Sequence, residues 1–220
     1  MPNEWLRKRK KDQFHRLAKA RGYRSRAAFK LQQIAKRYHP IRRGDLVLDL
    51  GAAPGGWLQA AHQIVGNNGY LLGVDKEPIA ELPFENVKTL EADILDGKAL
   101  SSILSSGPSK YDVVLSDLAP NVSGVWEVDH ARQIDLARCA FRIACIVLKP
   151  SGNFLVKVFQ GSEINDFRNE MKTRFRVFRI VKPLASRAES AELYFLGLGF
   201  LDSGESTSDY SVWRGRPKCI

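Results

Sequence analysis

DLVLDLGAAPGGW, residues 45–57, is the stretch of sequence that decides the fold of this chain. Its first six residues form an apolar run of strand length, and a glycine-rich turn and a helix follow at once. Glycine lets a backbone turn tightly and approach a ligand, and the start of a helix offers free N–H groups to that ligand. The stretch therefore predicts the first strand, loop and helix of an open α/β sheet, with a nucleotide-like ligand bound at the loop.

Strand and helix patterns alternate along the chain from this stretch onward. The apolar periodicity predicts strands over residues 45–50, 70–75, 87–92, 111–116, 153–159, 175–181 and 192–200, and helices near 55–65, 98–105, 128–147 and 163–173. Several strands are apolar at successive positions, which is typical of strands that are buried on both faces. We therefore predict an α/β protein with a doubly wound, Rossmann-like sheet of seven mostly parallel strands and helices on both faces.

The first 43 residues carry the positive charge of the chain. They hold 15 Lys and Arg against Glu4 and Asp12, whereas the whole chain has a net charge of +10, so residues 44–220 are slightly acidic. This asymmetry is typical of a surface that binds the phosphate backbone of a nucleic acid. A solvated basic helix without a partner is one alternative. An anionic membrane surface is another, although the apolar face of this segment is thin.

Two helices are expected within the basic segment. The first spans residues 3–20 and stops before Gly22; the second begins after Ser25, which can cap it, and ends before Pro40. Apolar residues at three- and four-residue spacing give the second helix a packing face, with Lys30 near its edge. We expect a basic arm that binds RNA over residues 1–43, one α/β domain over 44–200 and a flexible tail over 201–220.

Other features of the composition argue against several classes of protein. No apolar stretch approaches the roughly 18 residues that span a bilayer, and the N-terminus lacks a secretion signal, so a cytoplasmic protein is expected. Cys139, Cys145 and Cys219 are odd in number and form no C-x-x-C pair, which predicts no disulfide framework, and two of them should pack along a helix. The four histidines are scattered, which is typical of surface or lightly packed residues, and no protein-bound metal is expected.

Acidic residues near the strand ends indicate which nucleotide-like ligand the loop binds. Asp75 ends the second strand, where a carboxylate can accept both ribose hydroxyls of an adenosine, and Asp93 follows the third strand, near the adenine edge. The loop reads G-x-x-x-G-G from Gly51 instead of the G-x-G-x-x-G of a pyrophosphate site, and Asp49 just before it suits the ammonium of methionine. The sequence therefore favours S-adenosylmethionine over a dinucleotide. Trp57 is either a wall of this pocket or a residue of the core.

Two charged residues stand at the ends of central strands. Asp117 follows the fourth strand, and in a doubly wound sheet the ends of the first and fourth strands flank the crevice that binds ligands. Lys157 interrupts an apolar run of the fifth strand, where burial of an ammonium is costly unless it has a partner or a purpose. The residues alone leave open whether Lys157 forms a structural salt bridge or takes part in chemistry.

Five strings along the chain resemble successive motifs of one enzyme family. They are RSRAAFKL (24–31), DLGAAPGGW (49–57), SDLAPNVSG (116–124), LVKVFQG (155–161) and KPLASRAESAELY (182–194), with consistent spacing over about residues 5–200. In these strings the chain is similar to the FtsJ/RlmE 2′-O-methyltransferases, which transfer a methyl group from S-adenosylmethionine to a ribose. The resemblance implies a class I methyltransferase fold whose last strand is antiparallel.

The resemblance also implies the roles of individual residues. The family's Lys-Asp-Lys-Glu tetrad falls on Lys30, Asp117, Lys157 and Glu192, with Lys157 as the proton acceptor, and Glu189 is rejected because Glu192 stands in the matching SAELY string. The family's cofactor contacts fall on Gly55, Trp57, Asp75, Asp93 and Asp117. Burial, the second lysine and the sulfonium disfavour a charged Lys157, whereas the two carboxylates favour it. Whether Lys157 accepts the proton or polarises the hydroxyl therefore stays open.

The substrate that the resemblance implies is a uridine ribose in 23S-type large-subunit rRNA, bound by a monomer either as RNA or within the large ribosomal subunit. A tRNA anticodon-loop ribose 2′-O-methyltransferase would share the tetrad and the fold, and is the nearest alternative. An inactive RNA-binding ribosome assembly factor and a nicotinamide-dependent oxidoreductase are alternatives of other classes. The intact tetrad argues against the first of these, and the loop spacing argues against the second.

Overall fold

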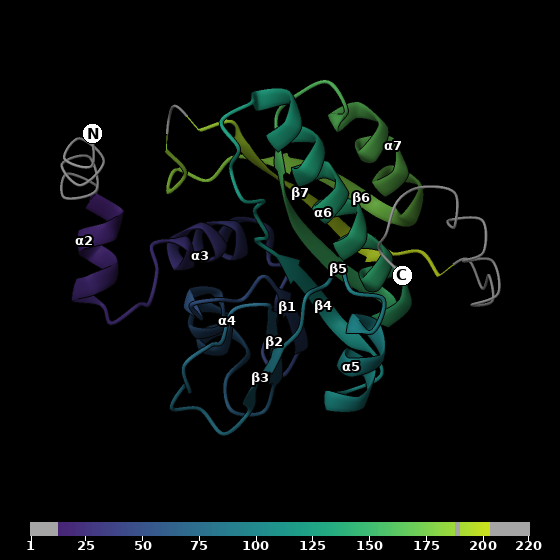
Figure 1. The fold of residues 1–220 in the computed structure, drawn as a ribbon. Coiled ribbons are helices and arrows are strands. Elements are labelled where there is room, and N and C mark those ends of the chain that lie inside the picture. The colour runs from purple at the N-terminus through teal and green to yellow at the C-terminus, as the bar shows by residue number, and fades with distance from the viewer. Residues whose placement is uncertain (1–12, 188–189, 203–220) are drawn as a thin grey trace.

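The computed structural model describes residues 13–187 and 190–202 (Figure 1). Its helices are α2 (Gln13–Ala20), α3 (Ala27–Tyr38), α4 (Gly56–Val65), α5 (Ala99–Ser106), α6 (Trp126–Val147) and α7 (Ile164–Arg174). Its strands are β1 (Leu46–Leu50), β2 (Tyr70–Asp75), β3 (Val87–Glu91), β4 (Tyr111–Ser116), β5 (Leu148–Phe159), β6 (Phe175–Val181) and β7 (Glu192–Phe200). Every strand and helix that the sequence predicts within the described ranges is present.

The seven strands form one sheet in the order β3-β2-β1-β4-β5-β7-β6. All pairings among β1 to β5 are parallel, and β7 runs antiparallel to both of its neighbours, β5 and β6. The chain proceeds outward in one direction from β1 and in the other direction from β4, so the order reverses between these two strands. This confirms the predicted doubly wound sheet and places the ligand crevice at the carboxyl ends of β1 and β4.

Helices cover both faces of the sheet and enclose two separate cores. Figure 1 shows α6 and α7 over one face and α3 and α4 over the other. The first core is rich in aromatic rings, among them Phe141, Phe154 and Phe167. The second core joins Leu31 of α3 and Leu58 of α4 to the opposite side of the same strands. Because both faces are covered, the central strands are apolar at nearly every position, as the sequence predicts.

Helix α3 packs as part of the second core, with Ala28, Leu31 and Ile34 almost completely buried. It ends as expected, because His39 adopts a left-handed conformation and the buried Pro40 follows. Residues 27–38 are therefore attached to the α/β core and do not form a free arm. The predicted role of residues 1–43 in binding RNA stays a prediction, and residues 1–12 lie outside the described ranges.

The predicted cap of α3 by Ser25 is wrong. Arg26 occupies the N-cap position with helical backbone angles, and its side chain makes no capping hydrogen bond. The Ser25 hydroxyl instead lies against Gly56, so closely that a Cβ built on this glycine would fall 2.1 Å from the Ser25 oxygen. The contact between the start of α3 and the start of α4 therefore decides where Ser25 points.

Strand β5 begins earlier than the sequence predicts, at Leu148 instead of residue 153. Its register with β4 shifts between the Tyr111–Leu148 and Val113–Asn153 pairs, and Ser151 has a positive φ of 64° within the shifted part. The strand thus contains a bulge where the sequence has Pro and Gly. The apolar periodicity of the sequence predicts only the regular part of the strand, which follows such a bulge.

His130 is buried, which contradicts the expectation that all four histidines are surface or lightly packed residues. It lies on α6, where its ring packs against Gly161 and its Nε2 accepts a hydrogen bond of 3.2 Å from the Glu163 backbone N–H. The other three histidines are partly or fully exposed, as expected. The burial of His130 follows from the way the loop after β5 folds over the start of α6.

Cys139 and Cys145 both lie on α6, as predicted, the first buried and the second half-buried. Cys219 and most of the predicted tail fall outside the described residues. Within residues 13–187 and 190–202, no helix combines the length and the apolar character needed to cross a membrane.

Candidate active site

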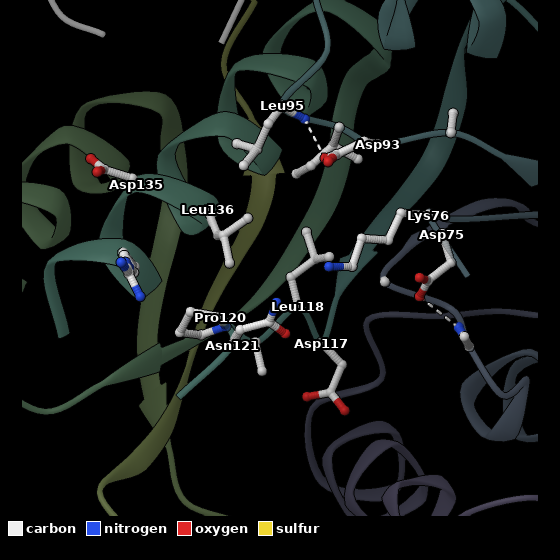
Figure 2. Close-up of a pocket in the computed structure, with 16 residues that line it drawn as sticks. Asp75, Lys76, Asp93, Leu95, Asp117, Leu118, Pro120, Asn121, Asp135 and Leu136 are labelled. Carbon is white, nitrogen blue, oxygen red and sulfur yellow. Dashed lines mark hydrogen bonds between the residues drawn. The ribbon is translucent and has the colours of Figure 1, made fainter. Parts of the chain in front are cut away.

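A cavity of about 740 Å³ opens at the carboxyl ends of the strands around the β1/β4 crevice (Figure 2). Its lining comes from the ends of β1 and β2, the loops after β3 and β4, and one side of α6. The residues are Gly51, Ala53, Asp75, Lys76, Ala92, Asp93, Ile94, Leu95, Asp117, Leu118, Ala119, Pro120, Asn121, Arg132, Asp135 and Leu136. A volume of this size is typical of sites that enclose a cofactor or a small ligand.

Gly51 sits where β1 turns into its loop, with a positive φ of 82°. A Cβ at this position would lie 2.8 Å from the side chain of Leu118 and 3.0 Å from its backbone nitrogen. The loop after β1 therefore packs directly on the loop after β4, and only glycine satisfies both the backbone angle and the close approach. This contact fixes the two loops that frame the cavity.

Asp75 and Asp93 both line the cavity, as the sequence predicts for contacts to an adenosine (Figure 2). The Asp75 carboxylate accepts hydrogen bonds from the backbone N–H groups of Ala53 (2.9 Å) and Glu77 (3.0 Å). Asp93 accepts one from the backbone N–H of Leu95 at 2.9 Å. Each carboxylate oxygen can accept a further bond, so both groups are held in place and still able to bind hydroxyl or amino groups.

The carboxyl group of Asp49 is completely buried, and neither of its oxygens has a hydrogen-bond partner. Burial raises the pKa of this group well above its ordinary value, and the nearby charges of Asp117 and Asp75 add to the effect. Asp49 is not among the residues that line the cavity. It therefore stands behind the wall of this cavity, and its predicted role toward the ammonium of methionine stays a prediction.

Gly55 and Trp57 also lie outside the cavity lining. Gly55 precedes α4 with a positive φ of 105°. The Trp57 ring is buried, its indole N–H donates to the Ala27 carbonyl at 2.8 Å, and its centroid lies 5.8 Å from that of Tyr194. Of the two interpretations of Trp57, the core residue fits its side chain, which joins α3, α4 and β7.

Lys157 and Asp117 form a buried ion pair at the edge of the cavity, which Asp117 lines. Lys157 Nζ donates to the Asp117 backbone carbonyl at 2.6 Å and lies 3.3 Å from Asp117 Oδ1. Their side chains are 7% and 16% exposed. The ammonium that is costly to bury in an apolar strand thus has both a charged and a neutral partner.

Lys30 and Glu192 form a second ion pair, with 2.6 Å between Nζ and Oε1 and side chains that are 12% and 13% exposed. The Ser186 hydroxyl donates to the same Glu192 oxygen at 3.0 Å. Lys30 reaches this position from α3 and Glu192 from the first residue of β7. The four tetrad residues come from α3, β5, β7 and the loop after β4.

Tyr194 connects the two ion pairs, although none of the sequence motifs assigns it a role in the site. Its hydroxyl lies 2.8 Å from Asp117 Oδ1 and 3.2 Å from Glu192 Oε1, and Lys30 Nζ lies 5.8 Å from its ring centre. Burial raises the Tyr194 pKa well above its ordinary value, and the charges of the two carboxylates raise it further. The phenol therefore stays protonated and donates its single proton to one carboxylate at a time.

The structure thus brings Lys30, Asp117, Lys157 and Glu192 together. The sequence does contain a signal that Tyr194 belongs to the site, because it stands two residues after Glu192 and therefore points to the same side of the strand. Glu189 lies outside the described residues. Among the residues that the structure does describe, no group of three or more His, Cys, Asp and Glu is arranged to hold a metal ion.

The sheet order and the ligand cavity at the β1/β4 reversal define a Rossmann-like methyltransferase. The chain belongs to the FtsJ-like methyltransferase family, whose model matches residues 23–200. Proteins named ribosomal RNA large subunit methyltransferase E are similar to it: that of Methanothrix thermoacetophila is 50% identical over 88% of this chain and 74% of its own length. The Methanocaldococcus jannaschii protein of that name is 46% identical over 87% of this chain and 80% of its own length. A Plasmodium falciparum crystal structure described as a putative ribosomal RNA methyltransferase is 26% identical, with a TM-score of 0.71 over 81% of this chain and 99% of that one.

Replacing Tyr194 by Phe should lower the free energy of unfolding by about 1.5–3 kcal/mol, because the two carboxylates lose the one hydrogen bond from a neutral donor that they share. Urea unfolding at neutral pH measures the change. Tyr38→Phe, at a half-buried tyrosine of α3, is the matched control and should cost less than about 0.5 kcal/mol. Equal effects of the two substitutions would contradict a bridging role for Tyr194.

Asp49→Asn should change how stability depends on pH. A carboxyl whose pKa is raised by folding keeps its proton more tightly in the folded state, so wild-type stability falls as pH rises above the unfolded value of about 3.9 toward the folded value. The variant lacks this group, and its stability relative to wild type should therefore grow between pH 4 and pH 8. Urea unfolding of both proteins across this range tests the sign, and parallel profiles would show that Asp49 titrates normally.

Proposed function

We propose that this chain is an S-adenosylmethionine-dependent RNA 2′-O-methyltransferase that acts on a uridine ribose of 23S-type large-subunit rRNA. The observation that carries the proposal is the convergence of Lys30, Asp117, Lys157 and Glu192 in two linked ion pairs at one end of the cavity. An inactive binding protein has no need to bury two lysines and two carboxylates beside a ligand pocket, since burial of such pairs seldom adds stability.

The cavity fits S-adenosylmethionine. Asp75 would accept the ribose hydroxyls and Asp93 would bind near the adenine, while Gly51 lines the cavity at the loop after β1. Apolar side chains of Ile94, Leu95 and others would pack on the adenine. When bound, the cofactor supplies an electrophilic methyl group on a sulfonium. Of the four tetrad residues, Asp117 borders the cavity. The target hydroxyl would therefore approach the cofactor from the side of Asp117 on which Lys157 lies.

The tetrad can position the ribose hydroxyl and handle its proton. Asp117 engages Lys157 through its carbonyl and its carboxylate, which leaves one N–H or one lone pair of Nζ free for the substrate. An uncharged Lys157 would accept the proton of the hydroxyl as the oxygen attacks. A charged Lys157 would instead hold the oxygen in line while alignment supplies most of the rate. Glu192 balances the charge of Lys30 and keeps that ammonium beside the site.

Support for an RNA substrate comes from the relatives and from the charge of residues 1–43. The named relatives are methyltransferases of large-subunit ribosomal RNA. In the described part of this segment, exposed basic side chains gather on and around α2 and α3, at Arg16, Lys19, Arg21, Lys36, Arg37, Arg42 and Arg43. We propose that they contact phosphates along the RNA and that the protein acts as a monomer on rRNA or on the large ribosomal subunit.

Lys157→Ala should reduce methyl transfer by about 100-fold or more, the usual contribution of a positioned acid or base. Cofactor and RNA affinities should stay within about two-fold of wild type, because neither binding surface is removed. Lys149→Ala is the matched control: this lysine lies on the same strand and pairs with Asp112 at 2.8 Å, but at the opposite end of the sheet. Loss of activity in both variants, or in neither, would contradict the assigned role.

Mapping identifies the substrate. Methyl transfer from labelled cofactor to fractionated cellular RNA, followed by mass mapping, should place the label on a uridine ribose of the large-subunit rRNA. A label on a tRNA anticodon loop would replace the substrate proposed here and leave the chemistry intact. Absence of transfer to naked RNA and to large subunits would favour an RNA-binding assembly factor.

A further inference from the structure

Exposed apolar side chains gather on the loop that follows Asp117 and on the start of α6. Val122 is 76% exposed, Val125 53%, Trp126 46% and Val128 39%. This segment leaves the active site directly, because Asp117 precedes it in the chain. A group of large exposed apolar side chains marks a surface that binds a partner or a ligand.

Trp126 is the outer ring of an aromatic stack. Its ring is nearly parallel to that of Phe159, with centroids 6.0 Å apart and 19° between the planes, and to that of His130, at 6.2 Å and 20°. His130 is itself fixed, because a Cβ on Gly161 would fall within 2.5 Å of its ring. The inner rings therefore support Trp126, while nearly half of its surface stays accessible to solvent.

Asp129 holds the loop that carries Trp126. Its carboxylate accepts hydrogen bonds from the Ser123 backbone N–H and hydroxyl, both at 2.7 Å, and from the Gly124 N–H at 3.2 Å. The bonds from Ser123 are the main reason that the pKa of Asp129 lies below its ordinary value. Gly124 makes the turn with a positive φ of 87°. The position of Trp126 is thus set before any ligand binds.

The stack adjoins the tetrad. Phe159 is paired with Glu192 in the β5/β7 register and lies two residues after Lys157. Lys182 and Arg187 are exposed on the segment that leads into β7, and the hydroxyl of Ser186 in the same segment donates to Glu192. An RNA strand whose ribose reaches Lys157 would therefore lie between basic side chains and an exposed aromatic face.

We propose that Trp126 stacks on a base of the RNA strand next to the methylated nucleotide, and so positions the ribose at Lys157. The inference rests on the proposed function, because it takes the strand at the tetrad to be RNA. An indole face binds any base through stacking. Because Phe159 and His130 already hold the Trp126 ring in place, less side-chain entropy is lost when a base binds to it. Trp126 is accordingly a positioning residue and not a catalytic one.

Binding of single-stranded hexauridylate to the full chain tests the proposal. Trp126→Ala should weaken binding of the fluorescein-labelled oligonucleotide by about 5- to 150-fold, the range that base stacking on an aromatic ring provides. Trp126→Phe should retain most of the affinity. Val122→Ala removes a more exposed apolar side chain from the same loop and should stay within about two-fold of wild type. S-adenosylmethionine affinity of each variant reports that the fold is intact.

Tryptophan fluorescence gives a readout that a merely structural role would not change. Unlabelled hexauridylate should quench the emission of a parent that carries Trp5→Phe and Trp213→Phe, and adding Trp126→Phe should remove a large part of that quenching, since the remaining Trp57 is buried. In methyl-transfer assays with purified rRNA, Trp126→Ala should raise KM for RNA far more than it lowers kcat.

Two results would overturn the proposal: oligonucleotide affinity of Trp126→Ala within two-fold of wild type, or equal losses in Trp126→Ala and Val122→Ala, which would indicate general apolar docking. Methyl transfer by the wild type would be unaffected by either result, so the proposed function would stand. If wild type instead failed to transfer methyl groups while the quenching from Trp126 persisted, the RNA contact would stand and the enzymatic function would fail.

Discussion

The burial of the Lys157 ammonium beside Asp117 is the constraint on which the rest of the site depends. An ammonium in an apolar strand is tolerated only with close partners, and the 2.6 Å bond to the Asp117 carbonyl and the nearby carboxylate provide them. Asp117 in turn is placed by the packing of its loop on Gly51. The same contacts that satisfy the buried charge therefore align the cavity with the tetrad.

Tyr194 makes the two ion pairs of the tetrad into one network. Its neutral hydroxyl lies within hydrogen-bonding distance of both carboxylates and can donate to either one. The Tyr194 ring lies near Trp57, which bonds to α3 through Ala27, so the helix that carries Lys30 is tied to β7. These contacts hold the four charged side chains in one fixed arrangement.

The strand and helix order was predictable from the sequence because the central strands are apolar on both faces and the helices between them keep a regular period. Motif strings likewise located the tetrad, since each member lies at the end or edge of a recognisable element. The exceptions have tertiary causes. The β5 bulge, the direction of the Ser25 side chain and the burial of His130 each depend on a contact with a residue distant in sequence, namely the β4 strand, Gly56 and the Gly161 loop.

The sequence by itself determined the doubly wound sheet and the loop that frames the cavity, because these follow from periodicity and glycine spacing, while the family resemblance indicated four charged residues of the site. Only the tertiary structure decided which carboxylates reach the cavity. Asp75 and Asp93 line it, whereas Asp49 points into the protein interior, although all three lie at or near the ends of neighbouring strands. The pleat and twist of the sheet turn side chains to one face or the other, and that direction is fixed only when the helices pack.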